Sequence, residues 1–414
     1  MTHQHAHDSH GLTRRTLLGG TASLVTATAF ARPAHARGAA HKPTLIQVFL
    51  RGGMDGLTAV VPHGDGDLYV LRPTLAVPPP GAAGGALDLD GFFGLPPAAA
   101  PLLTPYGNGH LAIVHAMGST DVTRSHFEAM ETMEFGDPSV PPMSLTSGWG
   151  ARYLVATAAP GTADLRGLSI GNNLPTTLRQ APDTLPVRDF TFDFPGRATT
   201  AAQRQVALLE AYARRHPLVA EPAFETIASF NLGGVDFAGY VPENGAVYPA
   251  GPFGDTLRNV AALLKADTGV EFVNINNNNL WDLHAFLGPL DGLMASLLSD
   301  LARGLEAFYL DMLGHLDDYL LFVVSEFGRH APENGSGGVD HGRGNAMFVL
   351  GDVNGGQVIA DWPGLSPAAL DFEDLAVTID YRDVLGELLL ARLGVTDLAP
   401  IFPGHLYSPR GVVS

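Results

Sequence analysis

Short apolar runs bounded by glycine or polar residues recur along the chain and predict buried strands of an α/β sheet. Longer segments with apolar residues at helical spacing lie between them. The predicted strands are 44–50, 110–116, 271–275, 320–324 and 346–350. The predicted helices are one that opens near 123–128, then 201–215, 255–265, 290–312 and 381–393. In such sheets ligands bind at the carboxyl ends of the strands, so polar residues there are the first candidates for chemistry.

The first 36 residues have the pattern of a twin-arginine signal peptide. Residues 13–18 (TRRTLL) carry the arginine pair, a small-residue apolar run follows at 17–31, and Ala34-His35-Ala36 offers a cleavage site. The alternative is a chance arginine pair before an apolar stretch. The pattern predicts a periplasmic or secreted protein whose residues 37–414 form a single domain. Within it, the Pro- and Gly-rich range 137–250 is interpreted as an insertion or cap over the sheet.

The charge balance of the chain excludes several classes of partner. Removal of residues 1–36 takes away three arginines and one aspartate, which leaves 21 basic and 41 acidic residues. Such an acidic chain disfavours nucleic acid and anionic membranes, because both are bound by basic patches. There is no cysteine, so a metal would be held by oxygen and imidazole ligands. No segment after residue 36 has the pattern of a membrane span, and nothing predicts the oligomeric state.

Carboxylates and histidines gather at the ends of the predicted strands. Imidazole and carboxylate groups are ligand types for zinc, manganese or calcium, and so many carboxylates at one edge would repel one another unless a cation neutralised them. Taken alone, Asp55 can instead be an Asx-turn residue of its Gly-rich turn, and an Asp-x-His pair is also common in solvated loops. The candidate metal ligands are Asp55, Asp282, His284, Glu326, Asp340 and His341.

Two hydroxyls precede the predicted helix that opens near residues 123–128. Thr123 or Ser125 at a helix N-terminus can act as a nucleophile, because the helix dipole and free amides stabilise a developing anion. Ser125 and Glu128 also match a capping box, and Thr123 is an equally good cap. Arg124 or Arg329 can steady the oxygens of a substrate, or either can form a surface ion pair.

In combination, several motifs resemble the family called "domain of unknown function 1501". They are LRGGMDG at 50–56, TRSHF at 123–127, WDLH at 281–284, SEFGR at 325–329, VDHGRGNAMFVLG at 339–351 and DYRDVLGE at 380–387. The resemblance covers essentially the whole mature chain. It implies the alkaline-phosphatase-like superfamily of sulfatases and phosphatases, with a mostly parallel sheet between helix layers and a one- or two-metal centre at the strand ends.

The resemblance also implies roles for individual residues. Asp55 resembles the aspartate after the first strand that binds a metal, and Asp282 with His284 resembles the pair that binds the other metal. His341, with Asp340, resembles a later histidine ligand, and Thr123 or Ser125 sits near the nucleophile. Two departures stand out: Glu326-Phe327 replaces the usual Asp-His, and the sulfatase motif C/S-x-P-x-R is missing.

These features predict an exported metal-dependent hydrolase of phosphate or sulfate esters. Its substrate would be a small-molecule or polymer ester, and its metal zinc, manganese or calcium. The alternative is a non-catalytic exported protein that keeps the fold and binds a polymer or partner. The Glu326-Phe327 pair and the ambiguous nucleophile support this second hypothesis.

Overall fold

The computed structural model describes residues 42–139, 145–159, 165–188, 190, 200–215 and 235–413. The chain divides into two compact units. One contains helix α7 (Ala201–Ala213), which matches the helix predicted at 201–215, and the other contains the remaining described helices and strands. The predicted signal peptide lies outside the described residues. None of the described helices has the length and apolar content needed to cross a membrane.

A nine-stranded sheet lies at the centre of the larger unit, in the order β10-β4-β9-β8-β1-β7-β5-β6 with β11 beside β4. All strand pairs are parallel except those that β9 makes with β4 and β8. The prediction of a mostly parallel sheet is therefore confirmed. The strands are β1 (Thr44–Leu50), β4 (Leu111–Gly118), β5 (Gly167–Ile170), β6 (Thr184–Val187), β7 (Phe272–Asn277), β8 (Tyr319–Val324), β9 (Asn345–Gly351), β10 (Gln357–Ile359) and β11 (Ile379–Asp380).

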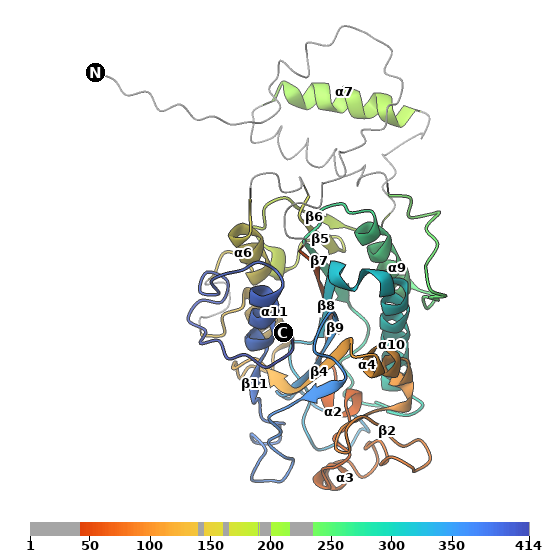
Figure 1. Ribbon diagram of the computed structural model, residues 1–414. Helices are drawn as coiled ribbons and strands as arrows, with labels where there is room; N and C mark the ends of the chain where they lie inside the picture. The colour runs from red at the N-terminus through yellow and green to blue at the C-terminus, as the bar shows by residue number, and fades with distance from the viewer. Residues whose placement is uncertain are drawn as a thin grey trace, which may run out of the picture. The chain divides into compact units, whose positions relative to one another are not determined.

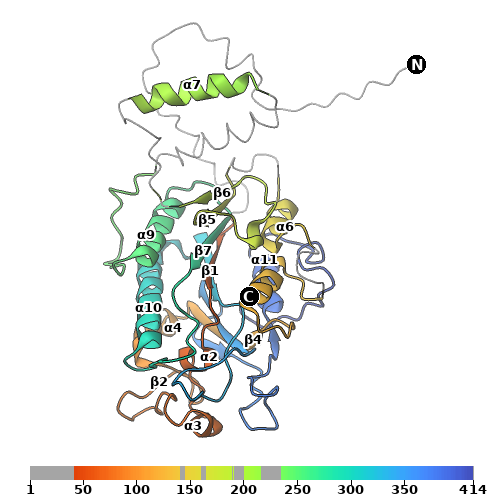
Figure 2. The same cartoon turned by 180° about the vertical axis from the view of Figure 1, so that it is seen from behind.

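Helices cover both faces of this sheet, as Figures 1 and 2 show from opposite sides. One face carries α6 (Trp149–Ala156) and α11 (Tyr381–Ala391), and the other carries α9 (Pro252–Lys265) and α10 (Leu293–Asp311). The long amphipathic helix predicted at 290–312 is thus confirmed as α10. Its apolar stripe is buried because an exposed helix face of this kind would leave apolar surface in water.

The remaining elements are short. They are α2 (Gly56–Ala59), α3 (Asp67–Leu71), α4 (Leu103–Gly107) and α5 (His126–Phe135), the small β2 (Leu87–Asp88) and β3 (Gly94–Leu95) pair, and the 3₁₀ turns η1 (Pro97–Leu102), η2 (Thr176–Leu178) and η5 (Leu313–Asp318). The range 137–250 contributes β5 and β6 to the central sheet. A capping role for the rest of that range stays a prediction.

The strand register brings five loops to one edge of the sheet. Leu50 at the end of β1 pairs with Asn277 at the end of β7, and Phe49 pairs with Val324 at the end of β8. Because β9 is antiparallel to both β8 and β4, β4 runs in the same direction as β8 and ends at the same edge. The segments after β1, β4, β7 and β8, and the segment that enters β9, therefore meet there.

A histidine is buried inside β4 without charge compensation. His115 Nε2–H donates to the carbonyl of Val60 at 2.9 Å, and its Nδ1 accepts from the amide of Ala116 at 2.7 Å. Both nitrogens are satisfied only in the neutral ring, because a second ring proton would face the Ala116 amide proton. Burial lowers the pKa of His115 to about 4. The ring stacks on Phe93, with centroids 5.3 Å apart.

Acidification is expected to destabilise the fold through His115. The unfolded chain binds a proton at this histidine near pH 6.5 and the folded chain only near pH 4, so the contribution is complete above pH 6.5 and declines as the pH falls toward 4. The loss reaches about 3 kcal/mol at most. Urea unfolding of the wild type and of His115→Gln across this range measures it. Equal pH slopes for the two proteins would contradict the expectation.

Candidate metal centre

Three histidines and one aspartate meet where the loops converge at the carboxyl edge of the sheet. His126 opens α5 after β4, Asp282 and His284 follow β7, and His341 precedes β9. The ligand atoms of His126, Asp282 and His341 all lie within 4.8 Å of one another. Asp282 Oδ1 is 3.4 Å from His126 Nε2, 3.0 Å from His284 Nε2 and 3.2 Å from His341 Nε2. Three imidazole Nε2 atoms therefore surround one carboxylate oxygen.

Two of these histidines are held from behind by carboxylates. His126 Nδ1 lies 2.7 Å from Glu326 Oε1, and His284 Nδ1 lies 2.7 Å from Asp340 Oδ1. A carboxylate accepts only, so each pair places the ring proton on Nδ1 and leaves the lone pair on Nε2. Glu326 is itself fixed by the amide of Gly52 at 2.8 Å. Glu326 and Asp340 were predicted as metal ligands, and the structure places them behind the histidines as hydrogen-bond acceptors.

The third histidine is held by a backbone carbonyl. His341 Nδ1 lies 2.8 Å from the carbonyl oxygen of Arg124, so its Nε2 also carries a lone pair. His341 Nε2 is 2.9 Å from His284 Nε2, and His126 Nε2 is buried without a hydrogen-bond partner. Lone pairs that face one another at this distance repel unless a proton or a cation lies between them. The donor set of three Nε2 atoms and one carboxylate oxygen fits a divalent metal ion.

Burial and neighbouring charges shift the pKa values of Asp282, His126 and His341 in different directions. Burial opposes ionisation of Asp282, but the hydrogen bond and charge of Arg329 lower its pKa to about 2, so it is anionic at neutral pH. The hydrogen bond to Glu326 raises the pKa of His126, although burial opposes this. Burial lowers the pKa of His341. Protonation of His126 would therefore compete with a cation for its Nε2.

Arg329 braces the site from beneath. This buried guanidinium donates from Nη2 to Asp282 Oδ1 at 2.6 Å and to the carbonyl of Gly52 at 2.6 Å, and from Nε to the carbonyl of Gly53 at 2.6 Å. Gly53 has a φ of +62° and lies under the Phe327 ring, so the loop after β1 needs a residue without a side chain there. The geometry makes Arg329 a positioning group for Asp282.

Asp55 lies outside this cluster. Its Oδ2 accepts from Arg72 Nη1 at 2.5 Å and from Thr58 at 2.6 Å, and its Oδ1 accepts from Arg72 Nη2 at 2.9 Å. Burial would raise the pKa of Asp55, but the charge of Arg72 lowers it on balance. Both oxygens are thus committed to a guanidinium rather than free for a metal ion. The ligand role that the sequence predicted for Asp55 has no support in this geometry, because a protein cation already neutralises it.

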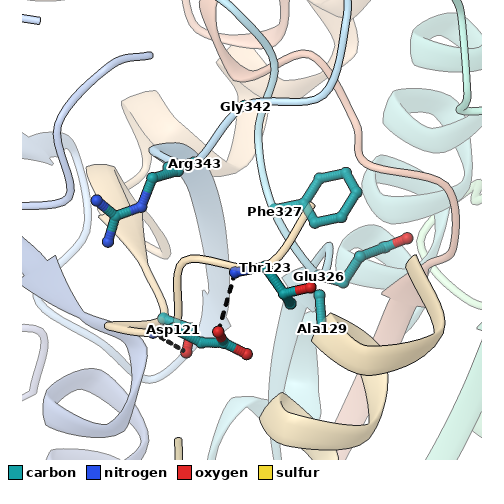
Figure 3. Close-up of a pocket in the computed structure, with 8 residues that line it drawn as sticks. Asp121, Thr123, Ala129, Glu326, Phe327, Gly342 and Arg343 are labelled. Atoms are coloured by element: carbon teal, nitrogen blue, oxygen red, sulfur yellow. Dashed lines mark hydrogen bonds between the residues drawn. The ribbon is translucent and has the colours of Figure 1, made fainter. Parts of the chain in front are cut away.

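The two candidate hydroxyls have different surroundings. Thr123 donates to Glu128 at 2.7 Å and accepts from the amide of Ser125 at 3.2 Å, so its hydroxyl is occupied. Thr123 and Glu326 line a small pocket whose wall also includes Arg343, as Figure 3 shows. Ser125 is the N-cap residue of α5, but its side chain makes no capping hydrogen bond. The predicted capping box is therefore absent, and the half-buried Ser125 hydroxyl is free beside His126.

The sequence alone did not identify His126 as a ligand. His126 lies within the TRSHF motif, where the two hydroxyls that precede it, Thr123 and Ser125, indicate a nucleophile instead. One signal was available: His126 follows the β4 strand as Asp282 follows β7, so it belongs to the same edge of the sheet. Its Nε2 direction depends on Glu326, which is 200 residues away in sequence.

The family comparison accounts for most of the described sheet and for the cluster. Residues 112–385 match the family described as "Protein of unknown function (DUF1501)". This match spans more than half of the chain. The chain belongs to the DUF1501 family. A comparison with curated proteins found no match. The family match includes every residue of the three-histidine cluster, and its description assigns no activity.

Several solved structures resemble this DUF1501 protein weakly. A sulfatase from Pseudoalteromonas sp. has 13% identity and a TM-score of 0.39, covering 90% of this chain and 73% of that one. An alkaline phosphatase from the Antarctic bacterium TAB5 has 8% identity and a TM-score of 0.31, with 77% and 95% covered. A phosphonate monoester hydrolase from Silicibacter pomeroyi has 11% identity and a TM-score of 0.33, with 84% and 72% covered. TM-scores below 0.5 support no inference about activity.

Replacing Asp55 is expected to damage the fold rather than the cluster. Asp55→Asn leaves Arg72 buried without its counter-ion, and breaking such a pair costs about 3–5 kcal/mol. Urea unfolding measures the loss, and Arg72→Met should lose a similar amount. Histidine NMR signals of the folded fraction should keep their positions. An Asp55→Asn protein with wild-type stability and altered histidine signals would contradict this assignment.

Proposed function

We propose that this chain is an exported, metal-dependent hydrolase of phosphate or sulfate esters. The observation that carries the proposal is the convergence of three imidazole Nε2 atoms on Asp282 Oδ1, each ring fixed at Nδ1 by an acceptor. The motif resemblance motivates the choice of esters as substrates. The twin-arginine pattern motivates export to the periplasm or the medium, where the protein would act on small-molecule or polymer esters.

The donor set favours zinc or manganese over calcium. Three imidazole nitrogens and one carboxylate oxygen suit zinc best, whereas calcium takes six to eight oxygen ligands. His126, His284, His341 and Asp282 would hold the ion, which would act as a Lewis acid on the ester oxygens. The carboxylates behind the rings raise the basicity of the nitrogens and fix their orientation.

Ser125 is the best placed nucleophile. It precedes the first residue of α5, and the free amides of that helix end stabilise negative charge that develops near it. Its oxygen would form the bond to phosphorus or sulfur as the ester oxygen leaves. The hydroxyl proton passes to solvent, and the departing alcohol takes a proton from solvent. Water would then cleave the serine ester, which returns a proton to the Ser125 oxygen and releases phosphate or sulfate. Thr123 holds Glu128 and the loop that precedes the helix, so it supports Ser125.

One observation favours the non-catalytic alternative. Asp55 is neutralised by Arg72, and Glu326 is committed to Gly52 and His126, so the described residues offer no second ligand group beside the first. A single ion can support either catalysis or simple structure. Stoichiometric metal uptake with no turnover of any phosphate or sulfate ester would favour a binding or structural role.

Zinc is expected to bind in one equivalent per chain and to depend on the clustered histidines. After bound metal has been removed with a chelator, calorimetry of the full chain with zinc should show one binding site. The double variant that combines His284→Ala and His341→Ala should lose this site. Glu326→Gln should weaken zinc binding by about 10–100-fold, because it loosens His126. His315→Ala is the matched control, since His315 lies on η5 before β8 and pairs with Asp318. Unchanged affinity in the double variant would refute the metal centre.

Ser125→Ala is expected to lose about 10³-fold or more in kcat for aryl phosphates or aryl sulfates while it keeps its zinc. Thr123→Ala serves as the control and should lose far less, because the threonine hydroxyl is already bonded to Glu128. Steady-state turnover of a panel of aryl mono- and diesters, with zinc content measured on the same samples, checks both variants. Full turnover by Ser125→Ala would exclude the serine mechanism and leave the metal centre standing.

A further inference from the structure

Three phenylalanines among the described residues are almost fully exposed to solvent. Phe127 is 86% exposed, Phe286 82% and Phe372 87%. The other phenylalanines among the described residues are buried or half-buried. An aromatic ring in water forgoes the stabilisation that burial gives, so three at this level of exposure call for a role. We refer to Phe127, Phe286 and Phe372 together as the phenylalanine rim.

Two members of the phenylalanine rim adjoin ligand histidines in the chain. Phe127 directly follows His126 in α5, and Phe286 lies two residues after His284. Consecutive Cα atoms are 3.8 Å apart, so neither backbone position is more than about 7 Å from that of its histidine. The two rings therefore extend from two separate segments that carry donor residues, the start of α5 and the loop after β7.

The loop that contains Phe372 is connected to the same region by an ion pair between Asp374 and Arg124. Phe372 lies two residues before the buried Asp374, whose Oδ2 accepts from Arg124 at 2.6 Å. The backbone carbonyl of Arg124 in turn holds His341 Nδ1 at 2.8 Å. The loop that carries Phe372 is thus tied to the segment between β4 and α5, which leads directly into His126 and Phe127 at the start of α5.

The backbone is strained at two members of the phenylalanine rim. Phe286 has a φ of +52° and Phe372 a φ of +60°, in the left-handed region that bulky residues rarely adopt. Phe372 occupies the first central position of a turn closed by two backbone hydrogen bonds between Asp371 and Asp374, where glycine is usual. Strained residues of this kind cluster at active sites and ligand-binding sites, where the surrounding structure holds them in place.

We propose that the phenylalanine rim binds the aromatic or long alkyl group of a substrate whose anionic ester head is held at the metal centre. This inference rests on the proposed function and specifies its substrate class. The adjacency in the chain of Phe127 to His126 and of Phe286 to His284 favours the substrate itself as the occupant, because a group attached to an ester at the cluster would lie close to both segments. An anionic lipid surface is disfavoured, since the chain carries a formal charge of −18.

The test uses non-hydrolysable phosphonates and the zinc-loaded full chain. Calorimetry should show that phenylphosphonate and octylphosphonate bind about tenfold or more tightly than methylphosphonate. The variant Phe127→Ser, Phe286→Asn, Phe372→Asn should reduce this preference to about twofold and keep its zinc affinity. Asparagine tolerates the left-handed backbone, so the variant is expected to fold. Val247→Ser is the matched control: this residue is 82% exposed and lines a pocket together with Leu310, which lies near the end of α10 and before β8 begins.

The outcomes separate the two proposals. Binding of none of the phosphonates to the zinc-loaded protein would overturn the hydrolase and the substrate class that depends on it. Equal binding of all three would overturn the phenylalanine rim alone, and so would an unchanged preference in the triple variant. Sedimentation of the same samples tests another occupant: a dimer that becomes a monomer in the triple variant, with phosphonate binding intact, would assign the rim to a subunit interface and overturn its role in substrate binding.

Discussion

Each imidazole at the centre of the site is held by a hydrogen bond at Nδ1, and the remaining chemistry of the site depends on these three contacts. Glu326, Asp340 and the Arg124 carbonyl are the acceptors. An imidazole without such an acceptor can rotate or place its proton on either nitrogen, and its lone pair then has no fixed direction. With the acceptors in place, all three Nε2 atoms face one point before any ligand arrives, so binding a cation requires little reorganisation.

Buried arginines neutralise carboxylates near the cluster and so reduce the repulsion between them. Arg329 neutralises Asp282 and closes the loop after β1, while Arg72 neutralises Asp55 and also donates to the carbonyls of His330 and Ala331. A guanidinium has donors in several directions, so it can satisfy a carboxylate and several carbonyls at once. As a result, four carboxylates lie near one edge of the sheet, but a single cluster among the described residues remains suited to a metal ion.

Rigid and strained parts have separate tasks in this molecule. The parallel strands β1, β7 and β8 are almost wholly buried and fix where the following segments begin, whereas the loops and the start of α5 carry the polar groups and the exposed phenylalanines. Strain at Phe286 and Phe372 is affordable because the sheet and its helices supply the stability. Asp55 belongs to the stabilising part of the molecule, because its buried ion pair with Arg72 stabilises the fold and leaves it no role in binding a metal.

By itself the sequence determined the five central strands of the sheet, the long helices and the edge of the sheet where the candidate residues gather, whereas β5, β6, β10 and β11 appear only in the structure. Apolar runs and helical spacing are local signals, and parallel strands bring their carboxyl ends together whatever the side chains do. It also singled out Asp282, His284 and His341, because ligand-type residues stand directly beside predicted strands there. Only the tertiary structure decided that the Nε2 atom of each histidine faces the centre of the cluster. It also decided that Asp55 pairs with Arg72 and that Glu326 accepts from His126 Nδ1. Those choices depend on partners that lie as many as 200 residues away in sequence, and spacing along the chain carries no information about them.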